Sequence, residues 1–340
     1  MSRRTWTLIV GMLLAVGLGT LGGIGTVPYV ALGPGPTYDT LGELGGTTVV
    51  AIDGETTYPT AGHLNMTTVS VSDDITMFDA LGKWVSGRYA IVPREEVFPP
   101  TKTEQQVEQE NAQAFQDSED NAEAAALTYL DYPTKIVVNT VISDTPADGK
   151  LEPGDELLAV NGVEITSADQ VREALAGTKP GQQVEVRYQR GSTTGTVDLT
   201  LATHPEDGNR GFLGVAPANH PDVPFDITIS LADVGGPSAG LMFALAIVDK
   251  LGPGELNGGR FVAGTGEINS DGQVGAIGGI PFKMAAARDA GATVFLVPEG
   301  NCLEAKQRAP EGLQLIKVTT LADAVSSLEA LRENRPTPSC

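Results

Sequence analysis

The chain begins with a single uninterrupted apolar run. No charged side chain occurs from Trp6 to Leu32, and Arg3 and Arg4 precede this run. A bilayer core needs roughly 20 apolar residues as helix, so the run is long enough to cross it. The two arginines favour a cytoplasmic N-terminus with the rest of the chain outside. We predict a cytoplasmic stub and transmembrane anchor over residues 1–32. A cleaved signal peptide is the alternative, although the run is long for one and has no clear cleavage site.

The next hundred residues first mix apolar and polar positions and then become strongly polar after residue 93. Alternating positions predict short strands at Thr47–Ile52 and Leu64–Val71. Residues 94–130 are acidic and rich in glutamine, and the spacing of a few apolar side chains around Phe115 predicts a helix with one thin apolar face. We expect residues 33–130 to form a small β-rich region followed by an acidic helical segment whose charges face solvent. We assign no chemistry to either part.

Short apolar runs separated by turn signals follow over residues 131–205. Asn161-Gly162 between two such runs is a strong hairpin signal, and Ser167 can cap a helix expected at about Ala168–Ala176. The stretch from Gly149 to Gly162, G-K-L-E-P-G-D-E-L-L-A-V-N-G, resembles a PDZ domain. The expected strands are Ile136–Ile142, Glu156–Val160, Val184–Gln189 and Thr196–Leu201.

The resemblance to PDZ domains implies a peptide-binding groove. In that family a peptide adds as a strand to a sheet edge beside the helix, here Ala168–Ala176. The family's glycine-rich, carboxylate-binding loop should precede the first matching strand, where this chain has Tyr129-Leu130-Asp131-Tyr132. Recognition of peptide carboxy termini is therefore left open. Gly211-Phe212-Leu213-Gly214 looks like such a loop but follows the PDZ-like stretch, so we assign it to the entry of the next domain.

Residues 211–332 carry the candidate chemistry. A predicted strand, Phe225–Leu231, leads into a glycine-rich turn and then a long apolar helix from Leu241. The turn presents Ser238 at the start of the helix, where backbone N–H groups could stabilise an oxyanion during acyl transfer. A serine that only caps the helix is the alternative reading. The other residues expected to shape this turn are Gly236, Pro237 and Ala239.

A serine nucleophile needs a base, and chain order argues against histidine. No histidine follows Ser238, as an α/β-hydrolase would require, and His220 has the wrong context for a chymotrypsin-like order. Lysine is the remaining base. Lys250 would lie about 18 Å further along the same helix and cannot reach. Lys283 begins a helix after Pro281 among apolar neighbours, which lowers the pKa of its amine, so we expect it within hydrogen-bond reach of Ser238.

Three ordered blocks resemble the proteolytic domain of Lon peptidases. They read G-P-S-A-G-L-M-F-A-L-A, A-G-T-G-E-I-N-S-D-G-Q-V-G-A-I-G-G-I-P-F-K-M-A-A-A and A-G-A-T-V-F-L-V-P-E-G-N. The resemblance implies that Ser238 is the nucleophile and Lys283 the base, with the Thr265 hydroxyl in support. With the N-terminal helix and the PDZ unit, the arrangement is similar to that of bacterial, membrane-anchored YlbL-type Lon-like proteases. The sequence leaves the oligomeric state open, and a homo-oligomer rests on analogy with Lon-type domains alone.

Two functions are compatible with these three sequence blocks, a peptidase and an inactive scaffold. The sequence contains no G-x-x-x-x-G-K-[ST] loop, so we predict no ATP hydrolysis by these residues. The expected function is an ATP-independent serine endopeptidase that cuts flexible or partly unfolded protein and peptide substrates outside the membrane. The runner-up is a membrane-tethered PDZ scaffold with an inactive Lon-like domain. Retention of both Ser238 and Lys283 favours the enzyme.

Composition and charge limit the classes of partner and cofactor that we expect. The formal net charge is −21, from 43 acidic and 22 basic residues, so we expect no nucleic-acid partner. No C-x-x-C pair or H-E-x-x-H helix occurs, and we predict no metal site or cofactor. Cys302 and Cys340 could pair outside the cytoplasm, or Cys302 could stay buried and free. The expected fold class is α+β, with a transmembrane helix, a small β-rich region, a PDZ domain and a Lon-type α/β proteolytic domain.

Overall fold

The chain divides into a larger and a smaller compact unit. The computed structural model describes residues 3–205, 207–231 and 234–340, so residues 1–2 of the expected stub and residues 232–233 of the turn before Ser238 lie outside it. The larger unit comprises Met1–Ala51, Thr56–Ala122 and Ile227–Cys340, and the smaller unit comprises Ile52–Glu55 and Glu123–Asp226.

The larger unit opens with helix α1 (Arg3–Ile24), which is apolar all round. Among the described residues it is the one helix long and apolar enough to cross a membrane. Gly22 is its one buried residue, so almost the whole apolar surface of the helix has no protein neighbour. A helix of this composition is stable where another apolar phase surrounds it.

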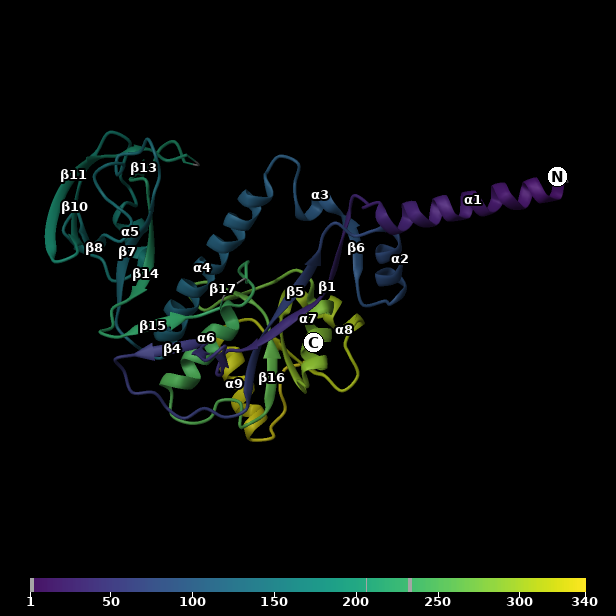
Figure 1. Ribbon diagram of the computed structural model, residues 1–340. Coiled ribbons are helices and arrows are strands. Elements are labelled where there is room, and N and C mark those ends of the chain that lie inside the picture. Colours follow the sequence, from purple (N-terminus) through teal and green to yellow (C-terminus); the bar gives the residue numbers. More distant parts are fainter. Residues whose placement is uncertain (1–2, 206, 232–233) are drawn as a thin grey trace. The chain divides into compact units, whose positions relative to one another are not determined.

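A six-stranded mixed sheet is the framework of the larger unit (Figure 1). The strand order is β20-β19-β16-β5-β1-β6. Strand β16 runs parallel to both β5 and β19, and β19 runs parallel to β20, whereas β1 is antiparallel to both of its neighbours. The bounds are Tyr29–Asp39 for β1, His63–Ser72 for β5, Ala90–Pro93 for β6, Phe261–Gly264 for β16, Val294–Pro298 for β19 and Gln314–Val318 for β20.

The N-terminal strands therefore belong to the same sheet as the C-terminal ones. Strand β5 pairs with β16 through His63–Met66 and with β1 on its other side. The separation of residues 33–130 as a region of their own, expected from the sequence, is wrong. Four consecutive residues of β5, Leu64–Thr67, are buried, as in a strand covered on both faces. The apolar pattern of β5 indicated a strand but could not indicate its partner.

Two helices from the C-terminal part of the chain position the candidate site. Helix α6 (Gly240–Leu251) is buried at every residue except Lys250, which explains its almost wholly apolar sequence. Helix α7 (Ile280–Ala290) packs against β1, β5 and β16. Apolar side chains from α7, β16 and β19, including Met284 and Phe295, form one core cluster. Helices α8 (Cys302–Gln307) and α9 (Leu321–Arg332) complete this part.

The smaller unit contains a six-stranded antiparallel sheet and a short helix. Its main strands have the order β11-β10-β8-β7-β14, and β9 pairs with β8. Asn161 and Gly162 both have positive φ, 49° and 75°, in the tight turn that the sequence predicted between β8 and β9. The bounds are Thr134–Val141 for β7, Glu156–Val160 for β8, Val163–Glu164 for β9, Ala168–Ala174 for α5, Gln183–Arg190 for β10, Thr193–Thr200 for β11 and Val215–Pro221 for β14.

Strand β14 corrects the expected domain boundary. It pairs antiparallel with β7 from Val215 to Pro221, so this segment completes the sheet of the smaller unit. The start of the proteolytic domain at residue 211 is therefore wrong, because the smaller unit continues to Asp226. The edge strand β14 comes from the end of the smaller unit's sequence rather than from its beginning. No local sequence pattern distinguishes such a strand from a connection between two domains.

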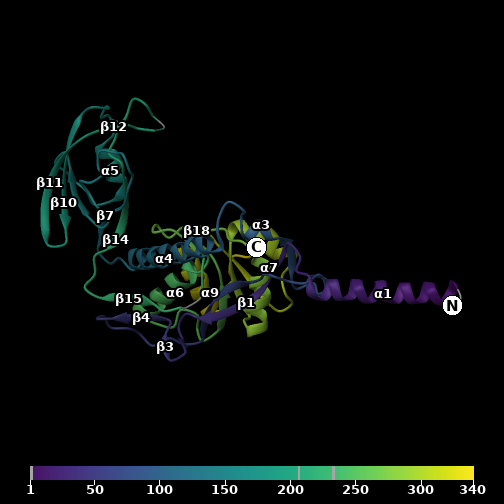
Figure 2. The ribbon, with the colours of Figure 1, turned by 45° about the horizontal axis from the view of Figure 1, so that its top comes forward.

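The remaining elements are shorter, except for one long helix. Helix α4 (Glu104–Tyr129) is the acidic helix that the sequence predicted, and it lies beside α6 in both views (Figures 1 and 2). Cys302 and Cys340 form a disulfide with their Cα atoms 5.1 Å apart, which settles the alternative left open above. The other elements are β2 (Glu43–Leu44), β3 (Thr47–Thr48), β4 (Val50–Asp53), α2 (Met77–Val85), α3 (Arg94–Val97), β12 (Ala202–Thr203), β13 (Gly211–Phe212), β15 (Asp226–Ile229), β17 (Glu267–Ile268), β18 (Val274–Gly275) and the 3₁₀ turn Glu299–Asn301.

Candidate active site

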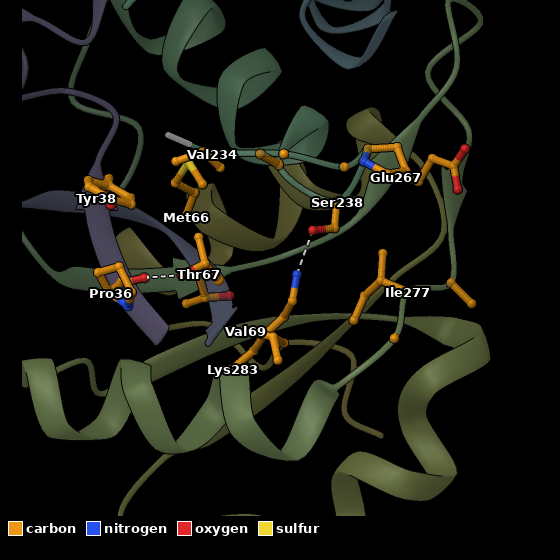
Figure 3. Close-up of a pocket in the computed structure, with 17 residues that line it drawn as sticks. Pro36, Tyr38, Met66, Thr67, Val69, Val234, Ser238, Glu267, Ile277 and Lys283 are labelled. Carbon is orange, nitrogen blue, oxygen red and sulfur yellow. Dashed lines mark hydrogen bonds between the residues drawn. The ribbon is translucent and has the colours of Figure 1, made fainter. Parts of the chain in front are cut away.

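The structure brings together the serine, lysine and threonine that the sequence singled out. Lys283 Nζ lies 2.6 Å from Ser238 Oγ and 2.9 Å from Thr265 Oγ1. In the close-up, the two side chains meet from opposite sides, Ser238 from the turn before α6 and Lys283 from α7 (Figure 3). The expected hydrogen-bond reach between Lys283 and Ser238 is present in the structure.

The turn before α6 fixes the position of Ser238. The next residue, Ala239, caps the helix by accepting the backbone N–H of Met242 at 2.9 Å. The Ser238 carbonyl accepts two hydrogen bonds at 2.9 Å, one from the Thr265 hydroxyl and one from the Gly266 N–H. The helix cap is therefore the neighbouring residue, and the Ser238 side chain stays directed at Lys283.

Burial sets the charge state of Lys283. The side chain extends from the first turn of α7 and is 3% exposed. Loss of hydration disfavours the ammonium form and lowers the pKa of Lys283 to about 8. Gly279, the residue just before α7, has φ of 72°, and a Cβ there would come within 2.6 Å of Val69. Gly279 thus permits the close approach of α7 to β5 that buries the lysine.

The turn offers fewer oxyanion donors than its sequence suggested. The Gly236 N–H already donates to the Asn111 carbonyl at 2.9 Å, and Pro237 has no N–H. Neither residue therefore offers a free N–H group to an oxyanion in this conformation. Ala239 stays a candidate donor, because its N–H lies at the positive end of α6, next to Ser238. Gly236, with φ of 87°, and Pro237 instead shape the turn.

Helix α4 supports the turn from behind, a role that the sequence did not reveal. Besides the bond from Gly236 to Asn111, the Ser118 hydroxyl donates to the Pro237 carbonyl at 3.0 Å. Phe115 packs edge-on against Phe243 of α6, with ring centroids 5.7 Å apart. The three groups of α4 that make these contacts are the Asn111 carbonyl, the Ser118 hydroxyl and the Phe115 ring. The polar sequence of the helix did not indicate these contacts, apart from the thin apolar face around Phe115.

A cleft of about 460 Å³ opens over the serine and lysine. One wall is the turn before α6 together with Glu267 and Ile277, and the other comes from β1 and β5 (Figure 3). Sequence reasoning assigned no chemistry to β1 and β5, because their distance along the chain from Ser238 hid their place in the fold. Their side chains in the cleft are Pro36, Tyr38, Met66, Thr67, Thr68 and Val69.

The smaller unit has a groove of its own, of about 330 Å³. It lies between α5 and β14 and ends at the loop Gly211–Gly214. The position expected for a glycine-rich loop, Tyr129–Tyr132, is therefore wrong, and Gly211–Gly214 is part of this groove rather than a domain entry. Gly214 has φ of 89°, and a Cβ there would come within 1.9 Å of Thr145 Oγ1, so the loop requires glycine.

The bases set aside from the sequence lie elsewhere. Lys250 Nζ donates to the Val50 carbonyl at 2.6 Å, and the His220 ring nitrogen Nδ1 lies 2.8 Å from the Pro221 carbonyl. Neither residue lines the cleft. Within the described residues, no group of three or more histidine, cysteine, aspartate or glutamate side chains is arranged to hold a metal ion.

Two segments of the chain match known protein families. Residues 226–330 match the family model of the Lon protease (S16) C-terminal proteolytic domain, and residues 106–201 match that of the PDZ domain. A Lon protease of Lachnoclostridium phytofermentans is 36% identical over 93 residues, 26% of this chain and 11% of that protein. A probable periplasmic serine endoprotease DegP-like of Ectopseudomonas mendocina is 34% identical over 89 residues, 26% of this chain and 19% of that protein. The matched segments thus span less than a fifth of these relatives.

Among solved structures, the PDZ domain of an SdrC-like protein from Listeria monocytogenes is 24% identical, covering 24% of this chain and 86% of that one with a TM-score of 0.23. The chain combines a PDZ domain with a Lon-type proteolytic domain on a mixed α/β framework. Its similarity to the Lon protease family is confined to the C-terminal proteolytic segment, residues 226–330.

Proposed function

We propose that this chain is a membrane-anchored serine endopeptidase that uses Ser238 as nucleophile and Lys283 as general base, without an ATPase. The observation that carries the proposal is the buried Lys283 amine, 2.6 Å from Ser238 Oγ, with its pKa lowered to about 8. An amine with this pKa is partly neutral near pH 8, so it can accept the serine proton.

The proposed reaction has two halves. As Ser238 Oγ attacks the peptide carbonyl carbon, the neutral Lys283 amine takes the hydroxyl proton. The N–H of Ala239 stabilises the oxyanion of the tetrahedral intermediate. The Lys283 ammonium then gives its proton to the leaving amine, which departs and leaves an acyl-enzyme. In the second half Lys283 takes a proton from a water molecule as that water attacks the ester carbonyl carbon. The ammonium then gives this proton to Ser238 Oγ as the ester C–O bond breaks, which releases the acid product and the free serine.

Thr265 has a supporting role in this proposal. Its hydroxyl donates to the Ser238 carbonyl and accepts from Lys283 Nζ, so it fixes both partners at once. Because Thr265 is fully buried, it does not contact substrate. It orients the lysine amine, which lowers the reorganisation needed for proton transfer.

We further propose that α1 anchors the chain and that the catalytic domain lies outside the cytoplasm. The apolar surface of α1 and the arginines before it support a single span with a cytoplasmic N-terminus. The disulfide between Cys302 and Cys340 supports an oxidising compartment for the larger unit. Without ATP-driven unfolding, the substrates are flexible or partly unfolded segments that fit the cleft.

For the smaller unit, we propose that the groove between α5 and β14 binds peptide carboxy termini. The support is the loop Gly211–Gly214 at one end of the groove, and the edge position of β14 in its sheet, where a peptide strand can add. A peptide with a free carboxy terminus should bind the full chain at least tenfold more tightly than its amidated form. Equal affinities in fluorescence anisotropy would show that the groove reads another feature.

The peptidase proposal is tested with the full chain in detergent micelles and a flexible protein such as casein. Ser238→Ala and Lys283→Ala should each lower kcat/KM by about a thousandfold or more. Lys317→Ala, at a half-buried position, and Ser326→Ala, at an exposed one, are matched controls outside the cleft and should keep full activity. Undiminished cleavage by either site variant would rule out the mechanism. A wild-type chain that binds peptides but cleaves none would favour a PDZ scaffold.

A further inference from the structure

Helix α2 turns its apolar face outward. Five of its nine residues are large and apolar, and each is between 49% and 70% exposed. At 3.6 residues per turn, these five side chains fall within an arc of about 120°. A surface helix of a soluble domain places such a stripe against the core, so this helix is inverted. The five residues, which we call the α2 face, are Met77, Phe78, Leu81, Trp84 and Val85.

The polar residues of α2 are engaged with the protein. Lys83 Nζ donates to Ser72 Oγ at 3.3 Å and lies 4.3 Å from the centre of the Tyr89 ring. Thr76 and Asp79 form a reciprocal capping box at the start of the helix. The orientation of α2 is therefore built by specific contacts on its polar side. The outward apolar face is a feature of the folded helix rather than the result of a frayed end.

The α2 face begins where α1 ends. The Val27 N–H, three residues after α1, donates to the Ile75 carbonyl just before α2 at 3.0 Å. Met77 and Phe78 pack against Gly22 of α1, where a Cβ would come within 2.8 Å of the Met77 side chain. The axis of α2 runs across that of α1 rather than along it (Figure 1). If α1 crosses a bilayer, α2 lies at its outer surface with its axis along that surface.

From this placement we propose that α2 is an interfacial helix whose apolar face inserts into the outer leaflet, at the boundary between headgroups and acyl chains. The inference rests on the proposed membrane anchor. Amphipathic helices with an exposed aromatic and aliphatic face bind at this depth, and tryptophan is enriched there. The lipid surface is favoured over a protein partner because the α2 face is continuous with α1. Anchor and helix together hold the larger unit at a fixed orientation to the membrane.

The test follows the environment of Trp84 in the full chain reconstituted into phosphatidylcholine vesicles. Trp6→Phe leaves Trp84 as the one tryptophan. Its emission should shift to shorter wavelength in vesicles, and lipid brominated near the headgroup end of the acyl chains should quench at least half of it. The matched control carries Trp6→Phe, Trp84→Phe and Leu303→Trp, because Leu303 on α8 is also strongly exposed, at 76%. The control tryptophan should show neither effect.

A second pair of variants separates insertion from general changes in the protein. In the Trp6→Phe background, Leu81→Lys should abolish most of the bromolipid quenching, whereas Leu303→Lys should leave it unchanged. Both leucines are exposed, so unfolding curves of both variants should match the parent. Quenching of Trp84 that survives Leu81→Lys would overturn the proposal.

The remaining outcomes distinguish the anchor from the interfacial helix. Vesicle flotation after alkaline washing tests α1 alone. If the chain floats but Trp84 is quenched by an aqueous quencher and not by bromolipid, the inference about α2 is wrong and the anchor stands. If the chain does not float, the anchor itself is wrong. A blue shift without bromolipid quenching, growing with protein concentration, would assign the α2 face to a second copy of the chain.

Discussion

Lys283 connects burial directly to chemistry at the scale of a single residue. Its pKa of about 8 results from the hydration that the amine loses on burial. Below this pH the amine is protonated and cannot take the serine proton. We therefore predict that kcat/KM on a peptide substrate falls about tenfold for each pH unit below about 7.5 and levels off above about 8.5. A stopped assay across this range, with a folding check at each pH, measures it. A flat profile would contradict the assignment of Lys283 as the base.

The same burial makes a prediction about stability. The pKa of Lys283 falls from 10.5 in the unfolded chain to about 8 in the folded one, so the folded state binds fewer protons between these values. Stability should therefore rise with pH through that window, and below it the buried ammonium costs up to about 3 kcal/mol. Lys283→Met should raise the free energy of unfolding at neutral pH by on the order of 1–3 kcal/mol, less whatever the two lost hydrogen bonds contributed.

Denaturant unfolding of the wild type and Lys283→Met at neutral pH and near pH 10.5 tests this. The difference between the two proteins should shrink at the higher pH, where the lysine is neutral in both states. Lys317→Met, at a half-buried residue paired with Glu299, is the control and should show no comparable pH-dependent gain. A variant that is less stable than the wild type at every pH would show that packing and hydrogen bonds outweigh the buried charge.

At the scale of elements, α4 holds the turn that presents the serine. The Ser118 hydroxyl donates to the Pro237 carbonyl, one residue before Ser238. Ser118→Ala removes this bond and should let the turn move, which misplaces Ser238 Oγ relative to Lys283 and bound substrate. We predict that kcat falls about tenfold while KM changes less than twofold, because small displacements affect the transition state most.

The control for this variant is Ser327→Ala on α9. Ser327 is buried like Ser118, and its hydroxyl has no hydrogen-bond partner among the described residues. Removing it should leave kcat unchanged. Equal losses of activity in the two variants would mean that Ser118 acts only through overall stability. An increase in KM alone would place Ser118 in substrate binding instead.

Local elements were predictable from sequence because their signals are local. The Asn161-Gly162 turn, the cap at Ser167 and the starts of α6 and α7 follow from conformational preferences of a few neighbouring residues. Pairing between distant segments has no such signal. The segments that form β14, β1 and β5 were therefore assigned to the wrong structural neighbours.

The candidate site likewise has one part that the sequence predicted and another that depends on the tertiary fold. Chemistry narrowed the pair to Ser238 and Lys283, because few side chains can serve as nucleophile and base, and the structure places them 2.6 Å apart. The cleft wall from β1 and β5 and the support from α4 depend on the tertiary fold. Their residues, such as Tyr38 and Ser118, are chemically ordinary, so no motif could have indicated them.

At the scale of the whole molecule, the last residues of the chain close an edge of the large sheet. Strand β20 lies at the end of the strand order, and the Lys317 N–H on its outer side donates to the Pro338 carbonyl at 3.1 Å. The disulfide from Cys302 to Cys340 ties this terminal segment to α8. A bare sheet edge can pair with another chain, so we expect the disulfide to protect the larger unit against aggregation.

We therefore predict two consequences of replacing both cysteines by alanine. A cross-link over 38 residues restricts the unfolded chain, and its loss should lower the free energy of unfolding by up to about 4 kcal/mol. The released terminus should also expose β20, so the variant should aggregate at protein concentrations where the wild type stays dispersed. Light scattering and unfolding curves measure the two effects separately. Lower stability without aggregation would mean that the backbone contacts of Pro338 hold the terminus in place without the cross-link, and that the disulfide acts on the unfolded chain alone.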